Sequence, residues 1–361
     1  MIPVSKPSLG TEEIELVKEV FDSSWLGSGA QVIEFEKKLE SFLCSQHVVA
    51  VNTGTSALHL SLEVAGVKPG DEVIVPSLTF CASIQAIIMC GARPVFCEVS
   101  PSDLCANPDN MEKLITSKTR AIVPVHYGGI AAQMDKILDM AKTHKIAVVE
   151  DAAHAFGSSF KGSKIGSFGH FTCFSFDPIK NITCGEGGAI STNDEVKANL
   201  LRKKIVLGID RESRSVITNG YRYHMSNINA AIGLAQLKKL ESFRASKVKI
   251  VNRYTEAFSE IDGISILAWN PMDTFPFICT IRIQGHNRDD LMQFLAKRGI
   301  NTSINYIPNH LQPFFKNGQK LPVTEQLFSE IITLPLFVDI TDDQVQFVIE
   351  SVAEFFKRSN R

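Results

Sequence analysis

The first two-thirds of the chain alternates between short runs rich in valine and isoleucine and stretches with helical periodicity. The runs include "HVVAV", "DEVIVP", "RPVFC", "RAIVPV" and "IAVVED", each closed by a polar residue, a proline or a glycine. Because polar and apolar residues do not alternate cleanly within them, we expect strands that are buried on both faces. The pattern predicts an α/β protein with a mostly parallel central sheet and helices on both faces.

The last third of the chain has a different pattern. "INAAIGLAQLKKLESFRASKVKIVNRYTEAF" predicts one long helix, which is followed by the apolar run "PFICTIRIQG", a helix at "NRDDLMQFLAKRG" and a terminal helix from near Asp342. Because 361 residues are more than one core usually supports, we predict a large domain at 1–240 and a small C-terminal α+β domain at 241–361. Residues 202–222 are charged and poorly periodic, and we expect a loop excursion there.

Charge and apolar content exclude several kinds of partner. The net charge is −2 and no stripe of lysine and arginine is present, so we expect no nucleic-acid partner. No apolar stretch reaches the roughly 18 residues of a membrane span, and the N-terminus does not read as a signal peptide. The eight cysteines form no CxxC pair, which favours small core side chains over a metal site. We therefore expect a cytoplasmic protein with no metal and no membrane partner.

One lysine, Lys180, stands in an unusual setting. It lies in "FSFDPIKNITCGEGG" (174–188), between an aromatic-rich run and a cluster of glycines. It is either an ordinary solvated lysine or one with a reason to be buried, because burial disfavours the charged form and lowers the pKa. Formation of a Schiff base with an aldehyde is such a reason. That interpretation requires the other parts of a cofactor site elsewhere in the chain.

Ligands of open α/β sheets bind beyond the carboxyl ends of the strands, and four polar segments of this chain fall at such ends. One of them is the segment around Lys180. Another, "NTGTSA" (52–57), begins a predicted helix. Thr55 and Ser56 there either belong to an ordinary helix cap or bind an anion, which the helix dipole attracts.

The other two segments follow strands as well. "EDAAHAFG" (150–157) carries Asp151 and His154, which form either a solvated strand end or a pair that faces the nitrogen and an oxygen of one heterocycle. "PSLTF" (76–80) ends on Phe80, which is either a core residue or a flat platform for a planar cofactor.

The order of these segments distinguishes between the alternatives. A phosphate-binding turn, an aromatic residue, an acid and then a lysine is the arrangement expected for pyridoxal phosphate on this kind of sheet. Lys180 then forms the Schiff base and Asp151 holds the pyridinium nitrogen. Ser175, five residues before Lys180, supplies a further hydroxyl for the phosphate.

The chain resembles the DegT/DnrJ/EryC1/StrS family of pyridoxal-phosphate sugar aminotransferases from end to end. The resemblance is carried by "GTSALHLSL", "GDEVIVPSLTF", "VEDAAHAFGSSFKG", "FSFDPIKNITCGEGGAIST" and "GYRYHMSNINAAIGLAQLKKLE". It implies a type I aminotransferase fold and a homodimer whose active sites are shared between the subunits.

The resemblance also implies roles for individual residues. Lys180 is the Schiff-base lysine, Asp151 contacts the pyridinium nitrogen, Phe80 stacks on the ring and His154 lies near its phenolic oxygen. Two positions depart from the family pattern: Arg222 stands where members usually have an asparagine that reaches the partner's phosphate, and Asp177 stands where many have histidine. The remaining assignments are to the phosphate, Thr55, Ser56 and Ser175, and to the substrate, Tyr306 and His310.

The function implied is the transfer of an amino group from L-glutamate, which leaves as 2-oxoglutarate, to a 3- or 4-keto nucleotide sugar in amino-sugar and surface-polysaccharide biosynthesis. "PVHYGG" and "IKNITCGEGG" look most like the UDP-4-amino-4-deoxy-L-arabinose aminotransferase branch, which favours the 4-keto position. A pyridoxamine-dependent sugar dehydratase of the same fold has histidine in place of the lysine, so Lys180 counts against it. A nicotinamide-dependent oxidoreductase lacks its glycine fingerprint here, and a non-catalytic regulatory binding protein is the remaining alternative.

Overall fold

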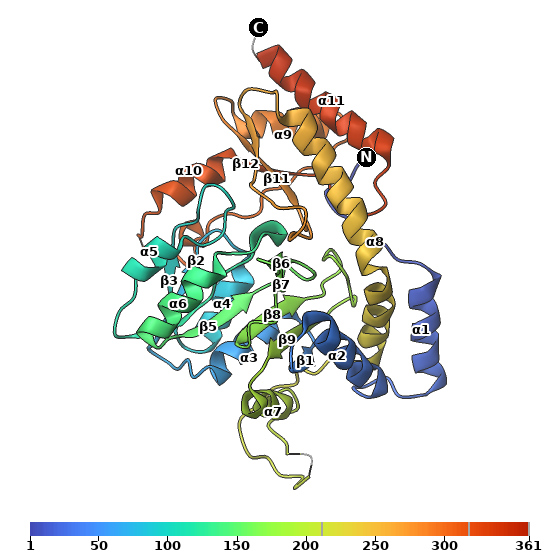
Figure 1. Cartoon of the computed structure of the whole chain (residues 1–361), viewed down its shortest axis with the longest axis vertical. Helices are drawn as coiled ribbons and strands as arrows, with labels where there is room; N and C mark the ends of the chain where they lie inside the picture. The colour runs from blue at the N-terminus through green and yellow to red at the C-terminus, as the bar shows by residue number, and fades with distance from the viewer. Residues whose placement is uncertain (211, 317, 360–361) are drawn as a thin grey trace.

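The computed structural model describes residues 1–210, 212–316 and 318–359, and its centre is a seven-stranded sheet (Figure 1). The strand order is β1-β9-β8-β5-β4-β2-β3, and β9 alone runs antiparallel to its neighbours. The predicted mostly parallel α/β sheet is confirmed. The strands are β1 (His47–Val51), β2 (Glu72–Pro76), β3 (Arg93–Cys97), β4 (Thr119–Ile122), β5 (Ala147–Asp151), β8 (Phe171–Ser175) and β9 (Gly188–Thr192).

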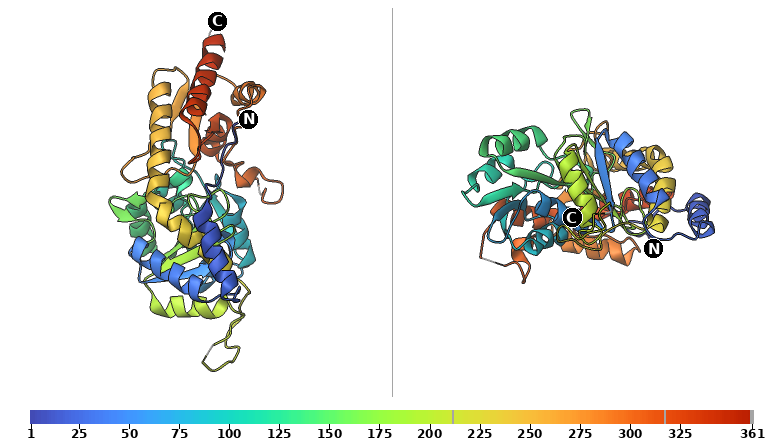
Figure 2. Two further views of the ribbon diagram at one scale, coloured as in Figure 1. Left: turned by 90° about the vertical axis from the view of Figure 1, so that its right-hand side faces the viewer. Right: turned by 90° about the horizontal axis from the view of Figure 1, so that it is seen from below.

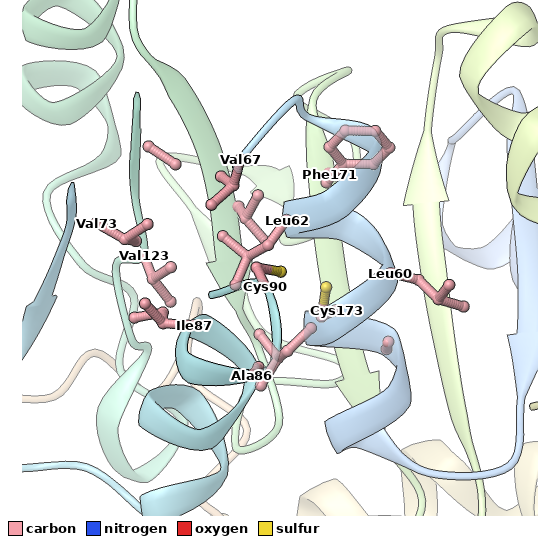
Figure 3. Packing of buried hydrophobic residues seen from close by; sticks show 14 of the residues in the cluster. Leu60, Leu62, Val67, Val73, Ala86, Ile87, Cys90, Val123, Phe171 and Cys173 are labelled. Carbon is pink, nitrogen blue, oxygen red and sulfur yellow. The ribbon is translucent and has the colours of Figure 1, made fainter. Parts of the chain in front are cut away.

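Helices cover both faces of this sheet. One face packs against α3 (Gly54–Val64), α4 (Cys81–Met89) and α7 (Glu195–Lys204) (Figure 3). The other packs against α2 (Ala30–Leu43), α5 (Pro108–Lys113), α6 (Met134–His144) and the first half of α8 (Asn227–Phe258), beside which lies α1 (Thr11–Asp22).

The strands are apolar at successive positions because both faces are covered. In β2, Val73 and Val75 belong to the cluster under α3 and α4, while Ile74 between them belongs to the cluster under α6. Successive strand residues point to opposite faces. In a strand that is buried on both faces, apolar residues therefore do not alternate with polar ones. This is the physical reason for the unbroken Val/Ile runs.

The C-terminal part forms a smaller unit around a three-stranded antiparallel sheet, β10 (Ile264–Ile266), β11 (Cys279–Ile283) and β12 (Ile331–Leu334). Figure 1 and the left view of Figure 2 show α8 continuing from the larger unit into this one. Although α8 is 32 residues long, no helix in the described parts of the chain is apolar enough to cross a membrane. The other elements are α9 (Arg288–Lys297), α10 (Pro322–Glu330), α11 (Asp342–Ser359), the short strands β6 (Ser159–Phe160) and β7 (Ser163–Lys164), and the 3-10 turns η1 (Tyr127–Gly129) and η2 (Asn309–Leu311).

The predicted division at 240/241 falls inside α8, and the N-terminus joins the smaller unit, where Ile2 pairs with Ile300. The division between the domains stays a prediction.

The predicted loop excursion begins later than expected. Arg202 lies in α7, which Asp194 caps and which buries Leu201 against the sheet. The last turn of α7 is basic because positive side chains are favoured at a helix C-terminus. The charge that predicted a loop from Arg202 onward therefore belongs to the end of a helix. The excursion proper closes on itself where Val206 pairs with Arg222.

Candidate active site

Lys180 lies in the turn that follows β8, where its backbone N–H donates to the carbonyl of Asp177 at 3.1 Å. The side chain is partly buried, and its Nζ lies 4.3 Å from the centre of the Phe277 ring. Burial lowers the pKa of Lys180 to about 8, against the opposing effect of the Asp151 and Asp177 carboxylates. The amine is therefore substantially neutral at mildly alkaline pH, as a nucleophile or general base must be.

Asp151 is the last residue of β5, and its buried carboxylate is held by two donors. The Ser83 hydroxyl donates to Oδ2 at 2.6 Å, and the backbone N–H of Ala153 donates to Oδ1 at 3.1 Å. Sequence reasoning missed Ser83. Its place one turn after Phe80 in α4 was the available signal, because residues three apart on a helix lie on the same side.

Phe80 is the residue before α4, and its side chain is 55% exposed although phenylalanine is usually buried. Its ring centre lies 5.6 Å from that of Tyr306. An exposed aromatic face beside a buried carboxylate is suited to a planar ring system.

His154 connects the loop after β5 to Tyr306. The Gly128 N–H donates to its Nδ1 at 3.3 Å, so the ring proton lies on Nε2, which is 2.9 Å from the Tyr306 hydroxyl. Burial, and secondly the nearby Lys180 ammonium, lower the pKa of His154 well below its ordinary value. His154 is therefore a neutral hydrogen-bond donor at physiological pH. His154, predicted for the cofactor, and Tyr306, predicted for the substrate, are therefore in contact.

The start of α3 packs directly against the end of β8. Thr53 caps the helix by accepting from the Ser56 N–H at 3.0 Å, and the Ser56 hydroxyl donates to Asn52 at 2.7 Å. A Cβ on Gly54 would lie 2.8 Å from the Cβ of Ser175, so only glycine lets the two elements approach this closely. The packing brings Thr55 and Ser56 to Ser175 at the positive end of an 11-residue helix, which attracts anions.

Two predicted site residues lie in other settings. His310 is buried, with Nδ1 2.7 Å from the Ser77 hydroxyl and Nε2 3.2 Å from Glu325. These contacts favour a role in holding the loop after β2 rather than a direct contact with substrate. Arg222 is exposed on the segment that runs beside Asn52, whose N–H donates to the Tyr223 carbonyl at 2.7 Å. Its predicted contact is with a partner subunit's phosphate and stays a prediction.

Glu150 supports the site from the opposite side of β5. Its carboxylate is 2.8 Å from His126 Nε2 and 2.7 Å from His170 Nε2. The side chains of Glu150 and His126 are fully buried, and that of His170 is mostly buried. Burial alone raises the pKa of Glu150, but the two histidines outweigh it and hold the pKa below the ordinary value. Because the backbone N–H of His126 donates to the Asp151 carbonyl at 3.1 Å, this cluster fixes the strand end that carries Asp151.

Together these residues fit pyridoxal phosphate. The start of α3 suits its phosphate, the exposed face of Phe80 its ring, Asp151 its ring nitrogen and Lys180 its aldehyde. The close packing at Gly54 places the Ser175 side chain beside the helix N-terminus, where its hydroxyl and the backbone N–H groups suit one phosphate.

Comparisons with known proteins agree with this geometry. Residues 7–353 match the sequence model of the DegT/DnrJ/EryC1/StrS aminotransferase family. The chain is 36% identical to the spore coat polysaccharide biosynthesis protein SpsC of Bacillus subtilis, over 99% of this chain and 97% of that protein. The aminotransferase TlmJ from Streptoalloteichus hindustanus superposes with a TM-score of 0.96 at 33% identity, covering 100% of both chains. The PLP form of the putative sugar aminotransferase Spr1654 from Streptococcus pneumoniae superposes with a TM-score of 0.92 at 30% identity, covering 99% of each chain.

Proposed function

Because the chain belongs to the DegT/DnrJ/EryC1/StrS aminotransferase family, whose cofactor is pyridoxal 5'-phosphate, we propose that it moves an amino group from L-glutamate to a nucleotide-activated ketosugar. The 4-keto position is favoured by the sequence segments around residues 124–129 and 179–188. The proposal rests on one observation above others: Asp151 ends β5 and Lys180 follows the adjacent strand β8, so both residues lie at the same edge of the sheet. That SpsC is named for polysaccharide biosynthesis supports the sugar substrate.

The residues of the chain have distinct tasks in this reaction. Pyridoxal phosphate supplies, when bound, an aldehyde that captures amines and a ring that accepts electrons. With the cofactor bound, the amine of the donor would displace that of Lys180, and Lys180 as a free base would move a proton away from the donor's α-carbon. Asp151 accepts a hydrogen bond from the protonated ring nitrogen, and Ser83 keeps that carboxylate in place. One water would supply the carbonyl oxygen of 2-oxoglutarate while the cofactor retains the nitrogen. The same steps in reverse would place the nitrogen on the sugar carbonyl carbon and release the carbonyl oxygen as water.

We further propose that the protein acts as a homodimer in the cytoplasm and that Arg222 completes the partner's phosphate site. Five exposed apolar side chains on α1, α2 and the loop between them support an interface, because their burial in a dimer would be favourable. They are Ile14, Phe21, Trp25, Leu26 and Ile33.

Replacing Lys180 tests the catalytic assignment. We expect Lys180→Ala to lower turnover of glutamate by at least about 10²–10⁴-fold, because no other residue is assigned the proton transfer, and to remove the visible absorbance of the lysine-bound cofactor. Lys161→Ala is the matched control, since that lysine is exposed and pairs with Asp135 at 2.7 Å. Turnover in Lys180→Ala equal to that of the control would show that the assignment is wrong.

The substrate is tested with a panel of nucleotide sugars that carry a keto group at C3 or C4, each supplied with L-glutamate. Mass spectrometry and NMR of the product identify the aminated carbon. We expect amination at C4, and amination of C3-keto sugars alone would overturn that part of the proposal.

A further inference from the structure

Lys204, the last residue of α7, is a buried lysine that joins three segments of the chain. It is 5% exposed, and its Nζ donates to the Glu63 carboxylate of α3 at 3.0 Å. It also donates to the side-chain oxygen of Asn219 at 2.7 Å and to the backbone carbonyl of the same residue at 3.2 Å. The Asn219 amide donates in turn to Glu63 at 2.7 Å. These three residues, the Lys204 cluster, connect α3, α7 and the end of the loop excursion.

Arg222 comes shortly after this cluster, and the backbone is held on either side of it. Before it, the Tyr221 N–H donates to the Lys204 carbonyl at 2.7 Å, so the residue that forms the cluster also pairs with the segment of Arg222. After it, the Tyr223 carbonyl accepts from the Asn52 N–H at 2.7 Å. The segment of Arg222 therefore lies between the end of α7 and the turn that begins α3, where the phosphate site is predicted.

The side chains next to Arg222 determine the side on which it emerges. The rings of Tyr221 and Tyr223 stack with their centres 4.8 Å apart, and they lie 4.9 and 6.1 Å from the ring of His59 in α3. Arg222 forms a β-bridge with Val206, and successive side chains of such an extended segment point to opposite sides. Arg222 therefore points away from the two tyrosines, which are partly buried, and is itself exposed.

The base of the excursion is packed backbone against backbone. A Cβ on Gly220 would lie 2.1 Å from the Gly208 nitrogen and 2.8 Å from the Lys204 carbonyl oxygen. Gly220 directly follows Asn219, so a displacement of Asn219 is carried into the segment of Arg222. The position of Arg222 thus depends on the hydrogen bonds that hold Asn219.

We infer that Lys204 is a positioning residue for Arg222: it holds Asn219 against Glu63 and thereby keeps the exposed arginine where it serves the phosphate site of the partner subunit. The inference deepens the proposed function, since it rests on Arg222 completing that phosphate site. A lysine suits this place because its ammonium has three donors, and the Glu63 and Asn219 oxygens accept three hydrogen bonds from it.

The test compares the affinities of the apoprotein for pyridoxal phosphate and for pyridoxal, which lacks the phosphate, by equilibrium dialysis. We expect Lys204→Met to weaken binding of pyridoxal phosphate by about tenfold, the effect of one hydrogen bond to a charged group, and to leave binding of pyridoxal unchanged. Asn219→Ala, at an exposed position, should act in the same direction. Lys197→Met is the matched control, because that exposed lysine of α7 pairs with Asp194 at 3.2 Å.

A combination with Arg222→Ala tests whether Lys204 acts through Arg222. Two changes that remove the same interaction do not add, so we expect Lys204→Met with Arg222→Ala to bind pyridoxal phosphate as Arg222→Ala alone does. Additive losses would overturn the inference. Equal losses for pyridoxal and pyridoxal phosphate in Lys204→Met would overturn it as well, because the whole site is then disturbed.

The other outcomes separate this inference from the proposed function. If Arg222→Ala weakens binding but Lys204→Met and Asn219→Ala do not, the inference alone is wrong. Wild-type affinity in Arg222→Ala overturns the role proposed for Arg222 and the inference with it. Circular dichroism checks the folding of each variant, and Asn219→Ala decides the question if Lys204→Met does not fold. The aminotransferase function fails separately, if Lys180→Ala retains turnover while the affinities change as expected.

Discussion

Lys180 and Lys247, a lysine buried in α8, have lowered pKa values for the same physical reason. Each is withdrawn from water, and desolvation is the largest effect on both. They differ in partners, because the Asp151 and Asp177 carboxylates favour the charged form of Lys180, whereas Lys247 donates a hydrogen bond to the neutral amide of Asn181.

The buried lysines give the apoprotein a pH-dependent stability. The pKa of Lys247 is about 7 in the folded protein and about 10.4 in the unfolded chain. Between these values the unfolded chain binds more protons, so folding becomes more favourable as pH rises through this window. We compare the free energies of unfolding of the wild type and of Lys247→Met. Between pH 7 and pH 10, we expect the wild-type value to rise by about 2–4 kcal/mol relative to the variant value.

Urea unfolding of both apoproteins at matched pH values measures this difference. Other titrating groups, Lys180 included, are present in both proteins and largely cancel. A constant difference across the whole range would mean that folding does not lower the pKa of Lys247, so that its amine stays charged in the folded protein.

At the scale of elements, the phosphate site depends on how closely α3 approaches β8. Gly54→Ala puts a methyl group 2.8 Å from Ser175 Cβ and 3.2 Å from its Oγ, and one of the two elements must then move. Overpacking of this kind costs about 1–3 kcal/mol. We expect a fall in unfolding free energy of that size and about tenfold or greater loss of pyridoxal phosphate affinity, both measured by titration of the apoprotein.

Gly27→Ala is the matched control, because a Cβ there meets nothing within 4 Å. The reasoning fails if Gly54→Ala binds the cofactor as tightly as this control does.

The same scale shows what the sequence could predict. The Val/Ile runs became strands and the long helix after residue 226 formed as expected, because burial on two faces and helical periodicity are local patterns. Lys180 and Asp151 were predicted from their places after strands, and their roles stay predictions. The contacts of Ser83 with Asp151 and of Lys247 with Asn181 span 68 and 66 residues of chain. Side-chain partners so far apart leave no periodic signal, and for this reason Ser83 and Lys247 were missed.

At the scale of the whole molecule, α8 joins the two units. Its first half packs under the central sheet and its second half reaches the smaller unit (Figure 1). Tyr254 and Phe258 pack in the smaller unit, and Lys247 precedes them in the second half of the helix. Tyr306, between α9 and α10, meets His154 of the larger unit at 2.9 Å. A site built from both units responds to their relative position, and the proposed second subunit would add Arg222 as a third contributor.

Hybrid dimers distinguish a shared site from a self-contained one. Suppose that Lys180→Ala and Arg222→Ala are each inactive as pure proteins. If Arg222 serves the partner's phosphate, a hybrid of the two variants has one site that lacks both residues and one site that is intact. Equal mixing gives half hybrids, so about a quarter of wild-type activity should return in a two-fold symmetric dimer. If Arg222 serves its own subunit instead, each hybrid site lacks one residue and no activity returns. The experiment needs only co-expression with two affinity tags and an aminotransferase assay. An exposed arginine on the segment beside Asn52 is accessible to a second chain, so we expect activity to return.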